Sequence, residues 1–451
     1  MEFSNFILYG LILLREFTIF IVLIHMIYKR RGPSSMMAWI LFMILVPYFA
    51  VILYFIFGTR KVRNKYKKEN IFVDKIESSD NNVEFEVYKT AMNGKMDIYF
   101  DYIESYEQFE NSIKKSKKSI YICTYLFKYD EVTKNIIELL EQKAKEGLEI
   151  KILIDSLGSL YTYLFQGRFK RLKELGVQIK FFMPIFQIPF RNYINLRNHR
   201  KIYIFDNQQV LSGGINLSKE YFGKEYIRNG WEDILFSCKG RCVEDFFTIF
   251  ASDWYYATNE RLKFDLIPMY EDGNDKIKVI PSGPDVKIDL LYETILDNIF
   301  SAKKRIWIVT PYFIPNETLT KALIIAKHKG VDIKLITPKK SNHLIVDLAR
   351  SSFLRELQEN EIDILLYRGP MLHAKAILFD DNWAMLGSVN LDNRSLFLNY
   401  EVSTFVSSDK IVSNIENWME QLVDNSVIGI NKASGIRVLF ENIMRIVSPQ
   451  I

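Results

Sequence analysis

Two long apolar stretches open the chain, and shorter apolar runs alternate with polar ones over the rest of it. The first stretch, Phe6–Tyr28, is interrupted by the charged pair Arg15-Glu16, whereas the second, Met36–Phe57, runs for 22 residues without a charge. About 20 apolar residues suffice for a helix to cross a bilayer core, and membrane helices tolerate an internal proline such as Pro47. We therefore predict an N-terminal transmembrane hairpin. Because charges at mid-membrane are costly, an interfacial position is the alternative for the first segment.

Beyond the apolar N-terminus, one pattern of apolar and polar residues occurs twice. An apolar run that ends in a polar turn, Lys117–Phe127, is followed by a helical stretch and by a second run after Gly147. Lys303–Phe313 and Gly330 repeat this arrangement, and each copy ends in a strand that carries His-x-Lys. Short strands that alternate with helices indicate α/β layers with a buried sheet. We predict an α/β fold of two pseudo-symmetric α/β/α sandwich halves, residues 83–262 and 276–451, after a membrane anchor with a basic flank at residues 1–68.

The positive charge of the chain is concentrated beside the apolar N-terminus. Residues 1–68 hold ten of the 59 basic residues and two of the 54 acidic ones, so the rest carries 49 basic and 52 acidic residues. A nucleic-acid enzyme needs its positive field on the catalytic part, so no nucleic-acid partner is expected, whereas an anionic bilayer suits this distribution. Six basic residues follow the second apolar stretch and three precede it in the connecting loop. This asymmetry predicts that the rest of the chain lies on the cytoplasmic side of the membrane.

Two segments share the motif His-x-Lys-x4-Asp-x6-Gly-[Gly/Ser]-x-Asn. The shared positions are His199, Lys201, Asp206, Gly213, Gly214 and Asn216 in the first copy and His373, Lys375, Asp380, Gly387, Ser388 and Asn390 in the second. The chain has only five histidines, so two copies of this spacing with the same tail are far outside chance.

The motif supplies the groups that phosphodiester transfer needs. Residues two apart on a strand project to one side, so each copy presents one imidazole and one ammonium to a shared site. One neutral imidazole can attack phosphorus while the other, protonated, gives its proton to the departing alkoxide. The lysines stabilise the negative charge that gathers on the non-bridging oxygens.

The remaining motif positions are assigned lesser roles. We predict that Asn216, Ser388 and Asn390 bind substrate as neutral donors. Asp206 and Asp380 belong to the predicted catalytic motif, but we expect them to hold backbone groups or a cation rather than to carry protons. The three cysteines form no zinc-like spacing with histidine, so neither a metal nor another cofactor is expected.

Further segments extend a likeness beyond the two motifs. They are RRGPSSMMAWILFMILVPYF with YFIFG (Arg30–Gly58), RNHRKI (Arg197–Ile202), SGPD (Ser282–Asp285), TPYFIP (Thr310–Pro315) and NYEV (Asn399–Val402). On these residues the chain resembles the phospholipase D superfamily, and most of all the bacterial cardiolipin synthases, over nearly its whole length. The resemblance implies phospholipase D-like halves and a covalent phosphatidyl-histidine intermediate. One phosphatidylglycerol would lose glycerol, and the 3-hydroxyl of a second would then attack to yield cardiolipin.

The resemblance also implies individual roles. His199 is expected to be the nucleophile and His373 the general acid and then base. Glu401, 28 residues after His373, resembles the family's acidic residue that holds a histidine in one tautomer. The first half has no acid at that offset, and Asp233, 34 residues after His199, is the nearest candidate for the equivalent role.

Other interpretations remain open at this point. The same histidines would serve a phospholipase D-type hydrolase, a nuclease, or a transphosphatidylase with another acceptor alcohol, and a membrane scaffold with a degenerate site is a third class. Phe181–Phe190 is either a buried crossover or a lip that dips into the bilayer. Gly435–Val447 spaces apolar residues along one helical face, which indicates core packing. Because the two halves can build the site within one chain, the chemistry requires no particular oligomeric state.

Overall fold

A computed structural model of the protein describes residues 2–28, 33–57, 91–185, 195–264, 273–286 and 288–447. The apolar N-terminus forms three helices, α1 (Glu2–Tyr28), α2 (Pro33–Leu45) and α3 (Pro47–Phe57). The apolar run Met36–Phe57, expected to be one helix with an internal proline, is divided into two: α2 ends at Leu45 and α3 starts at Pro47, which lacks the N–H that a continuous helix needs. Among the described residues, no helix combines the length and the apolar character that crossing a bilayer requires.

Fourteen of the strands form two equivalent sets of seven. The first set comprises β1 (Ala91–Tyr99), β2 (Ser119–Thr124), β3 (Glu149–Asp155), β4 (Gln178–Phe182), β5 (Ile202–Phe205), β6 (Gln209–Gly213) and β7 (Leu235–Lys239). The second comprises β8 (Asp275–Ser282), β9 (Arg305–Val309), β11 (Asp332–Pro338), β12 (Asp363–Tyr367), β13 (Ala376–Phe379), β14 (Trp383–Gly387) and β16 (Glu401–Ser407).

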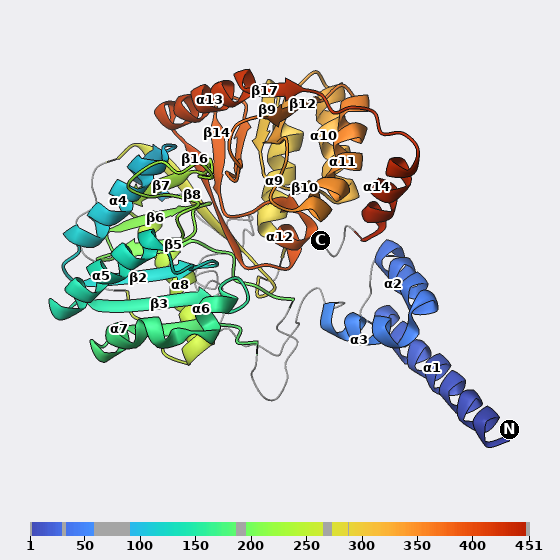
Figure 1. Ribbon diagram of the computed structural model, residues 1–451. Helices are drawn as coiled ribbons and strands as arrows, with labels where there is room; N and C mark the ends of the chain where they lie inside the picture. The colour runs from blue at the N-terminus through green and yellow to red at the C-terminus, as the bar shows by residue number, and fades with distance from the viewer. Residues whose placement is uncertain are drawn as a thin grey trace, which may run out of the picture.

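These strands join into one sheet in the order β17-β12-β11-β9-β13-β14-β16-β8-β1-β7-β6-β5-β2-β3-β4. Read outward from the antiparallel pair β1–β8, the two sides carry the same succession of strands, so β5 is equivalent to β13 and β7 to β16. The added β17 (Ser426–Ile428) extends the second side, and β10 (Phe313–Ile314) pairs with β15 (Leu391–Asp392) in a small separate sheet. The predicted internal repeat is therefore a pseudo-twofold arrangement in the described structure (Figure 1).

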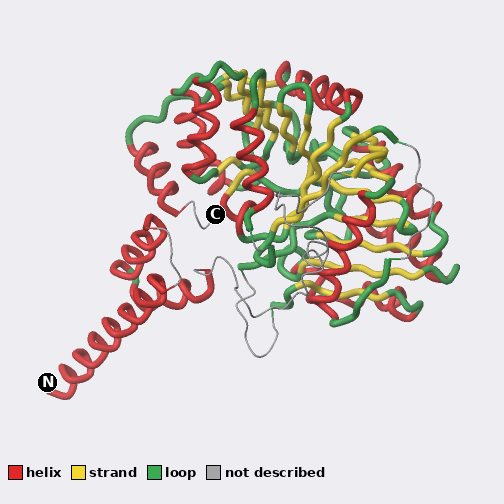
Figure 2. The backbone as a smooth tube through the Cα atoms, turned by 180° about the vertical axis from the view of Figure 1, so that it is seen from behind, coloured by secondary structure: helices red, strands yellow, loops and turns green. Residues whose placement is uncertain are grey.

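Helices cover the sheet on both faces, and Figure 2 shows the strands running through the middle of the molecule. In the first half these are α4 (Tyr102–Lys115), α5 (Glu131–Lys145), α6 (Leu160–Leu164), the 3-10 turn Gln166–Phe169, α7 (Lys170–Glu174) and α8 (Cys242–Thr258). In the second half they are α9 (Leu290–Ser301), α10 (Glu317–His328), α11 (Leu344–Glu359), α12 (Asn393–Phe397) and α13 (Asp409–Asp424), and α14 (Ile436–Val447) packs on the outer side of α11. Separate cores lie under α4, α5 and α7 and under α9–α11, whereas the core around α8 and α13 draws residues from both halves. The shared core fixes the two halves against each other.

The C-terminal helix α14 is oriented opposite to expectation. Core packing was predicted for its apolar face, but Ile436 is 72% exposed, and Leu439 and Phe440 are also exposed. The buried residue is Glu441, which forms ion pairs with Arg355 of α11 and with Arg437 one turn earlier. Buried charges need partners, and these two arginines set which face of α14 turns inward.

The other ambiguous stretch, Phe181–Phe190, is only partly described. Phe182 and Met183 are buried at the end of β4, as a crossover would require. Residues 186–190, including the phenylalanines proposed for a lip, lie outside the described residues.

Candidate active site

The two motif histidines lie at the same edge of the joined sheet. His199 comes three residues before β5, whose first residue, Ile202, pairs with Cys123 near the end of β2. His373 comes three residues before β13, whose first residue pairs with the last residue of β9. Both histidines therefore sit at the carboxyl ends of the central parallel strands, where loops from several strands meet.

Backbone hydrogen bonds link the two halves at the histidines themselves. The N–H of His199 donates to the carbonyl of Tyr400 at 2.9 Å, and the N–H of His373 donates to the carbonyl of Glu232 at 2.7 Å. Tyr400 in turn donates to the carbonyl of Arg197, and Glu232 to that of Met371, each at 2.9 Å. Each histidine is thus clamped to the segment of the opposite half that leads into an acidic residue.

The acidic partners are exchanged between the halves. Nδ1 of His199 lies 3.0 Å from both carboxylate oxygens of Glu401, and Nδ1 of His373 lies 2.6 Å from Oδ2 of Asp233. Each acid therefore contacts the histidine of the other half, which offsets counted along the sequence do not reveal. A carboxylate on Nδ1 fixes the proton there and leaves Nε2 for chemistry.

Register explains why Asp233 and Glu401 are equivalent despite their different offsets. Gly213 pairs with Leu235 and Gly387 with Ser403, so both acids stand two residues before the partner of the motif glycine. The six-residue difference in offset lies in the loop that connects the motif to the acid. It changes the spacing along the sequence but not the pairing in the sheet.

The two lysines are buried beside the histidines. Nζ of Lys201 donates to the carbonyl of His199 at 2.6 Å, and Nζ of Lys375 lies 2.8 Å from Nδ1 and 3.1 Å from Nε2 of His373. Burial lowers the pKa of Lys201 to about 7 and that of Lys375 to about 8. An incoming phosphate would favour the charged form of both buried lysines.

The histidines are held neutral in the substrate-free site. Burial, and then the charge of Lys375, lowers the pKa of His373 to about 3, and burial also lowers the pKa of His199, against the pull of Glu401. The charge of each lysine is felt at the histidine of the other half as well as at its own. Burial would raise the pKa of Asp233, but Lys375 and His373 outweigh it and hold that carboxyl ionised.

The predicted substrate donors behave differently from one another. Ser388 donates to Oε2 of Glu401 at 2.5 Å and so positions the acid. In the first half, Gly214 stands at the position of Ser388, and a Cβ there would lie 2.0 Å from Oδ1 of Asp233. Asn216 accepts the N–H of Leu126 at 3.2 Å. Oδ1 of the buried Asn390 has no hydrogen-bond partner among the described residues.

Asp206 and Asp380 lie away from the chemistry. Asp206 follows the far end of β5 from His199 and accepts the backbone N–H groups of Lys117, Lys118 and Ser119 at 2.7–3.1 Å. Asp380 accepts the equivalent N–H groups of residues 303–305 over the same range of distances. Both carboxylates therefore fasten the start of a central strand, in agreement with the structural role expected for them.

Aromatic side chains that the sequence analysis did not predict pack against the two histidines of the site. The ring of Tyr125 lies 4.8 Å from that of His199, and the rings of Tyr221 and Trp231 each lie 5.1 Å from that of His373. Tyr125 stands at the polar turn where the first repeated strand ends, a position the repeat could have singled out. Arg200 was also missed; it is buried, pairs with Asp253 at 2.7 Å and donates to the carbonyl of Glu401 at 3.0 Å.

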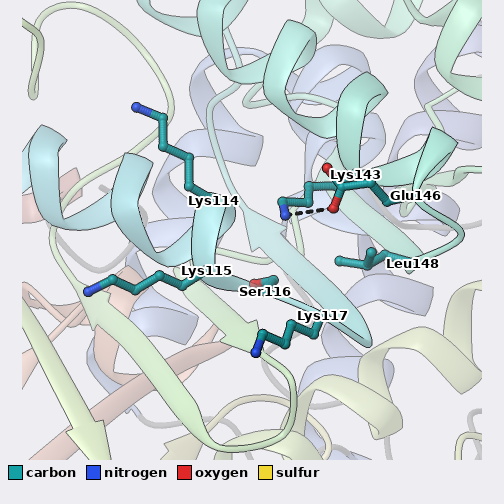
Figure 3. A pocket seen from close by; sticks show the side chains of 7 residues that line it. All are labelled: Lys114, Lys115, Ser116, Lys117, Lys143, Glu146 and Leu148. Atoms are coloured by element: carbon teal, nitrogen blue, oxygen red, sulfur yellow. Dashed lines mark hydrogen bonds and ion pairs between the residues drawn. The ribbon is translucent and has the colours of Figure 1, made fainter.

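A cavity of about 580 Å³ lies elsewhere, at the opposite edge of the sheet (Figure 3). Its lining residues are Lys114, Lys115, Ser116, Lys117, Lys143, Glu146 and Leu148. It adjoins the backbone that Asp206 fastens, so the length of β5 separates it from His199. Within the described part of the chain, no group of three or more His, Cys, Asp or Glu side chains could hold a metal ion.

Comparison with known proteins identifies the family. The family described as "Cardiolipin synthase, PLD-like domain" matches residues 109–254 and 295–423, and "Phospholipase_D-nuclease N-terminal" matches residues 17–58. A cardiolipin synthase of Clostridium perfringens strain SM101 is 31% identical over 93% of this chain and 95% of its own length. The chain belongs to the bacterial cardiolipin synthase family of the phospholipase D superfamily.

Other members of this family and a solved structure agree. A cardiolipin synthase of Listeria welshimeri is 30% identical over 91% of each chain. The fold is similar to that of the crystal structure of phosphatidylserine synthase from Haemophilus influenzae, with a TM-score of 0.62 at 15% identity over 79% of this chain and 95% of that one. The two-repeat α/β fold of cardiolipin synthases and their phospholipase D relatives is thus shown for this chain.

Proposed function

We propose that this enzyme is a phosphatidyltransferase that makes cardiolipin and glycerol from two molecules of phosphatidylglycerol. The observation that carries the proposal is the exchange of acids between halves, in which Glu401 contacts His199 and Asp233 contacts His373. It is supported by the effect of both lysine charges on both histidines. The lipid itself comes from the family, because the cardiolipin synthases of C. perfringens and L. welshimeri cover most of the chain.

The charges of the site suit a phosphodiester. Two lysine ammonium groups balance the carboxylates of Asp233 and Glu401, which leaves the site near neutral with both imidazoles unprotonated. A phosphodiester adds one negative charge, which favours the protonated forms of the basic groups around it, the two lysines and the two imidazoles. Binding of substrate would therefore raise the pKa of one histidine and load the proton that the leaving group needs.

The reaction follows from these groups in two steps. Nε2 of His199 attacks phosphorus, the bond to the glycerol oxygen breaks, and His373 gives its proton to that oxygen. The 3-hydroxyl of a second phosphatidylglycerol then gives its proton to His373 and attacks phosphorus, and the P–N bond breaks to regenerate His199. The lysines stabilise the charge on the non-bridging oxygens in both steps.

Accessibility favours His199 as the nucleophile. Its side chain is 12% exposed against 5% for His373, and among the described residues its Nε2 makes no hydrogen bond. Both ring nitrogens of His373 lie within 3.1 Å of Nζ of Lys375. Burial and Lys375 lower the pKa of His373 to about 3, so His373 can act as the general acid only after bound substrate has raised its pKa and protonated it.

We further propose that residues 1–68 form a membrane hairpin that carries catalytic halves at 83–262 and 276–451 on the cytoplasmic side. Support comes from the family match over residues 17–58 and from the exposed apolar side chains of α1, among them Leu13 and Phe17. The basic residues that follow the second apolar stretch are the argument for orientation.

Product analysis tests the function. Purified full-length protein is incubated with labelled phosphatidylglycerol in detergent, and lipids and water-soluble products are separated. Cardiolipin with an equal amount of glycerol is expected. Phosphatidic acid as the main product would make the protein a hydrolase, and a product formed only with an added alcohol would make it a different transphosphatidylase. His199→Ala is the inactive control.

A further inference from the structure

Exposed apolar side chains flank the site on both halves. In the first half, Tyr161, Leu164 and Phe165 of α6 and its end are each more than half exposed, and in the second half Leu344 and Ile345 at the start of α11 are 72% and 61% exposed. Groups of large exposed apolar side chains on a soluble protein often mark an interaction surface. We call these five residues the apolar rim.

The two parts of the apolar rim occupy equivalent positions in the repeat. α6 follows β3, and α11 follows its equivalent β11, so both rim segments leave the carboxyl edge of the sheet where the histidines lie. Duplication alone does not preserve exposed apolar residues, because the two segments differ in length and sequence. Their shared character indicates a shared surface.

Contacts tie the first rim segment to the site and the second rim segment to the equivalent turn of its own half. The hydroxyl of Ser159, just before α6, donates to the carbonyl of Tyr125, whose ring lies against His199. In the second half, the ring of His343 lies 5.9 Å from that of Tyr312, whose hydroxyl donates to Asn342 at 2.6 Å. Tyr312 occupies the turn after β9 that corresponds to the turn of Tyr125 after β2.

Cationic side chains accompany the apolar ones. The guanidinium of Arg168 lies 4.1 Å from the ring centre of Tyr129 and 4.8 Å from that of Tyr161. Lys339 and Lys340 are exposed just before the second rim segment. Apolar side chains with neighbouring cations suit the surface of an anionic bilayer, because the apolar groups can enter the acyl-chain layer while the cations bind the lipid phosphates.

We propose that the apolar rim inserts into an anionic lipid bilayer and seats the site over the headgroups, so that lipid reaches the histidines without crossing water. The proposal rests on the proposed function for the source of the lipid. It assigns a membrane-docking surface on the catalytic halves, separate from the N-terminal helices.

A depth measurement tests the rim without turnover. The three native cysteines are all buried, so a cysteine introduced on the surface can be labelled selectively with an environment-sensitive nitrobenzoxadiazole dye. Phe165→Cys and Ile345→Cys report on the rim, and Phe300→Cys is the matched control, because Phe300 is an exposed apolar residue at the opposite edge of the sheet, shortly before β9. The full chain is reconstituted in vesicles of equal parts phosphatidylglycerol and phosphatidylcholine.

We expect a blue shift and quenching by spin-labelled acyl chains at positions 165 and 345 but not at position 300. Labels that remain as water-exposed as the control, in protein that is otherwise active, would overturn the rim. Insertion of the labels by protein that forms no cardiolipin would instead overturn the proposed function and leave the rim in place.

Kinetics supply a second readout. The double substitution Leu344→Ser, Ile345→Ser should raise KM for phosphatidylglycerol in vesicles by about tenfold or more, because each lost side chain forfeits a factor of roughly three or more in apolar burial. The KM for dissolved short-chain phosphatidylglycerol should change by less than about twofold in this variant. In Phe300→Ser, the KM values for both forms of the lipid should also change by less than about twofold. An equal loss on both substrates would show that the rim shapes the site rather than docking it.

Discussion

The exchange of acids between the halves predicts which variants should behave alike. Glu401→Gln keeps the shape of the side chain but removes the charge that faces Nδ1 of His199 at 3.0 Å. As Nε2 bonds to phosphorus, positive charge develops on the ring, with the carboxylate about 4 Å from its centre. At an effective dielectric constant of about 20, the attraction is about 4 kcal/mol. The amide dipole recovers part of it, so a loss of about 3 kcal/mol, or a fall in kcat of about 10²-fold, is expected.

The assay compares two donors. One carries glycerol as the leaving group, and the other carries p-nitrophenol, which departs without a proton. Variants that damage the general acid should be rescued by p-nitrophenol, and variants that damage the nucleophile should not. The exchange of acids between the halves predicts that Asp233→Asn responds to the two leaving groups as His373→Ala does. It likewise predicts that Glu401→Gln responds as His199→Ala does.

The pairing in this comparison does not depend on which histidine is the nucleophile. If the roles are reversed, both pairs exchange patterns together. The exchange of acids would be refuted if Glu401→Gln showed the leaving-group response of His373→Ala and Asp233→Asn showed that of His199→Ala.

Further expectations concern charge, capping and packing. Burial lowers the pKa of Lys201 to about 7 and that of Lys375 to about 8, so the lysines lose their protons as pH rises and kcat/KM should fall from about pH 7. Lys201→Arg should move this decrease in kcat/KM up by about one pH unit. A decrease at the same pH in the variant would contradict the role given to Lys201. Asp206→Ala should cost roughly 1–3 kcal/mol of unfolding free energy, measured as a lower Tm, with kcat within about threefold; a loss of turnover without a change in Tm would make it catalytic. Gly214→Ala should displace Asp233, whose Oδ1 would lie 2.0 Å from the new Cβ, and should match Asp233→Asn in rate and in leaving-group rescue; normal kinetics would show that the carboxylate can move aside.

Much of the fold was accessible from the sequence because a repeat doubles the signal. The paired motifs and the matched strands predicted two α/β halves, and the register of β5 and β13 places the histidines at corresponding positions. Asp206 stands at the end of a strand, where an aspartate readily accepts backbone N–H groups, and the structure shows it accepting those of residues 117–119.

Features that depend on contacts between distant segments were not accessible. An offset of 28 or 34 residues says nothing about which half an acid faces, and the pairing followed only from the backbone bonds of Tyr400 and Glu232 across the seam. The helical period of α14 located an apolar face correctly, but the direction of that face depends on Arg355, 86 residues away from Glu441 in the chain. Periodicity describes a helix by itself and is blind to such partners.

The reciprocal holding of histidines constrains how such a duplicated protein can diverge. Where each copy of a repeat is self-sufficient, one can decay into a passive support while the other retains the reaction. Here the carboxylate lent by one copy serves the imidazole of the other, so a lesion in either damages chemistry rooted in both. Neither half can lose its acid or its histidine without impairing the reaction, so both halves must be retained together.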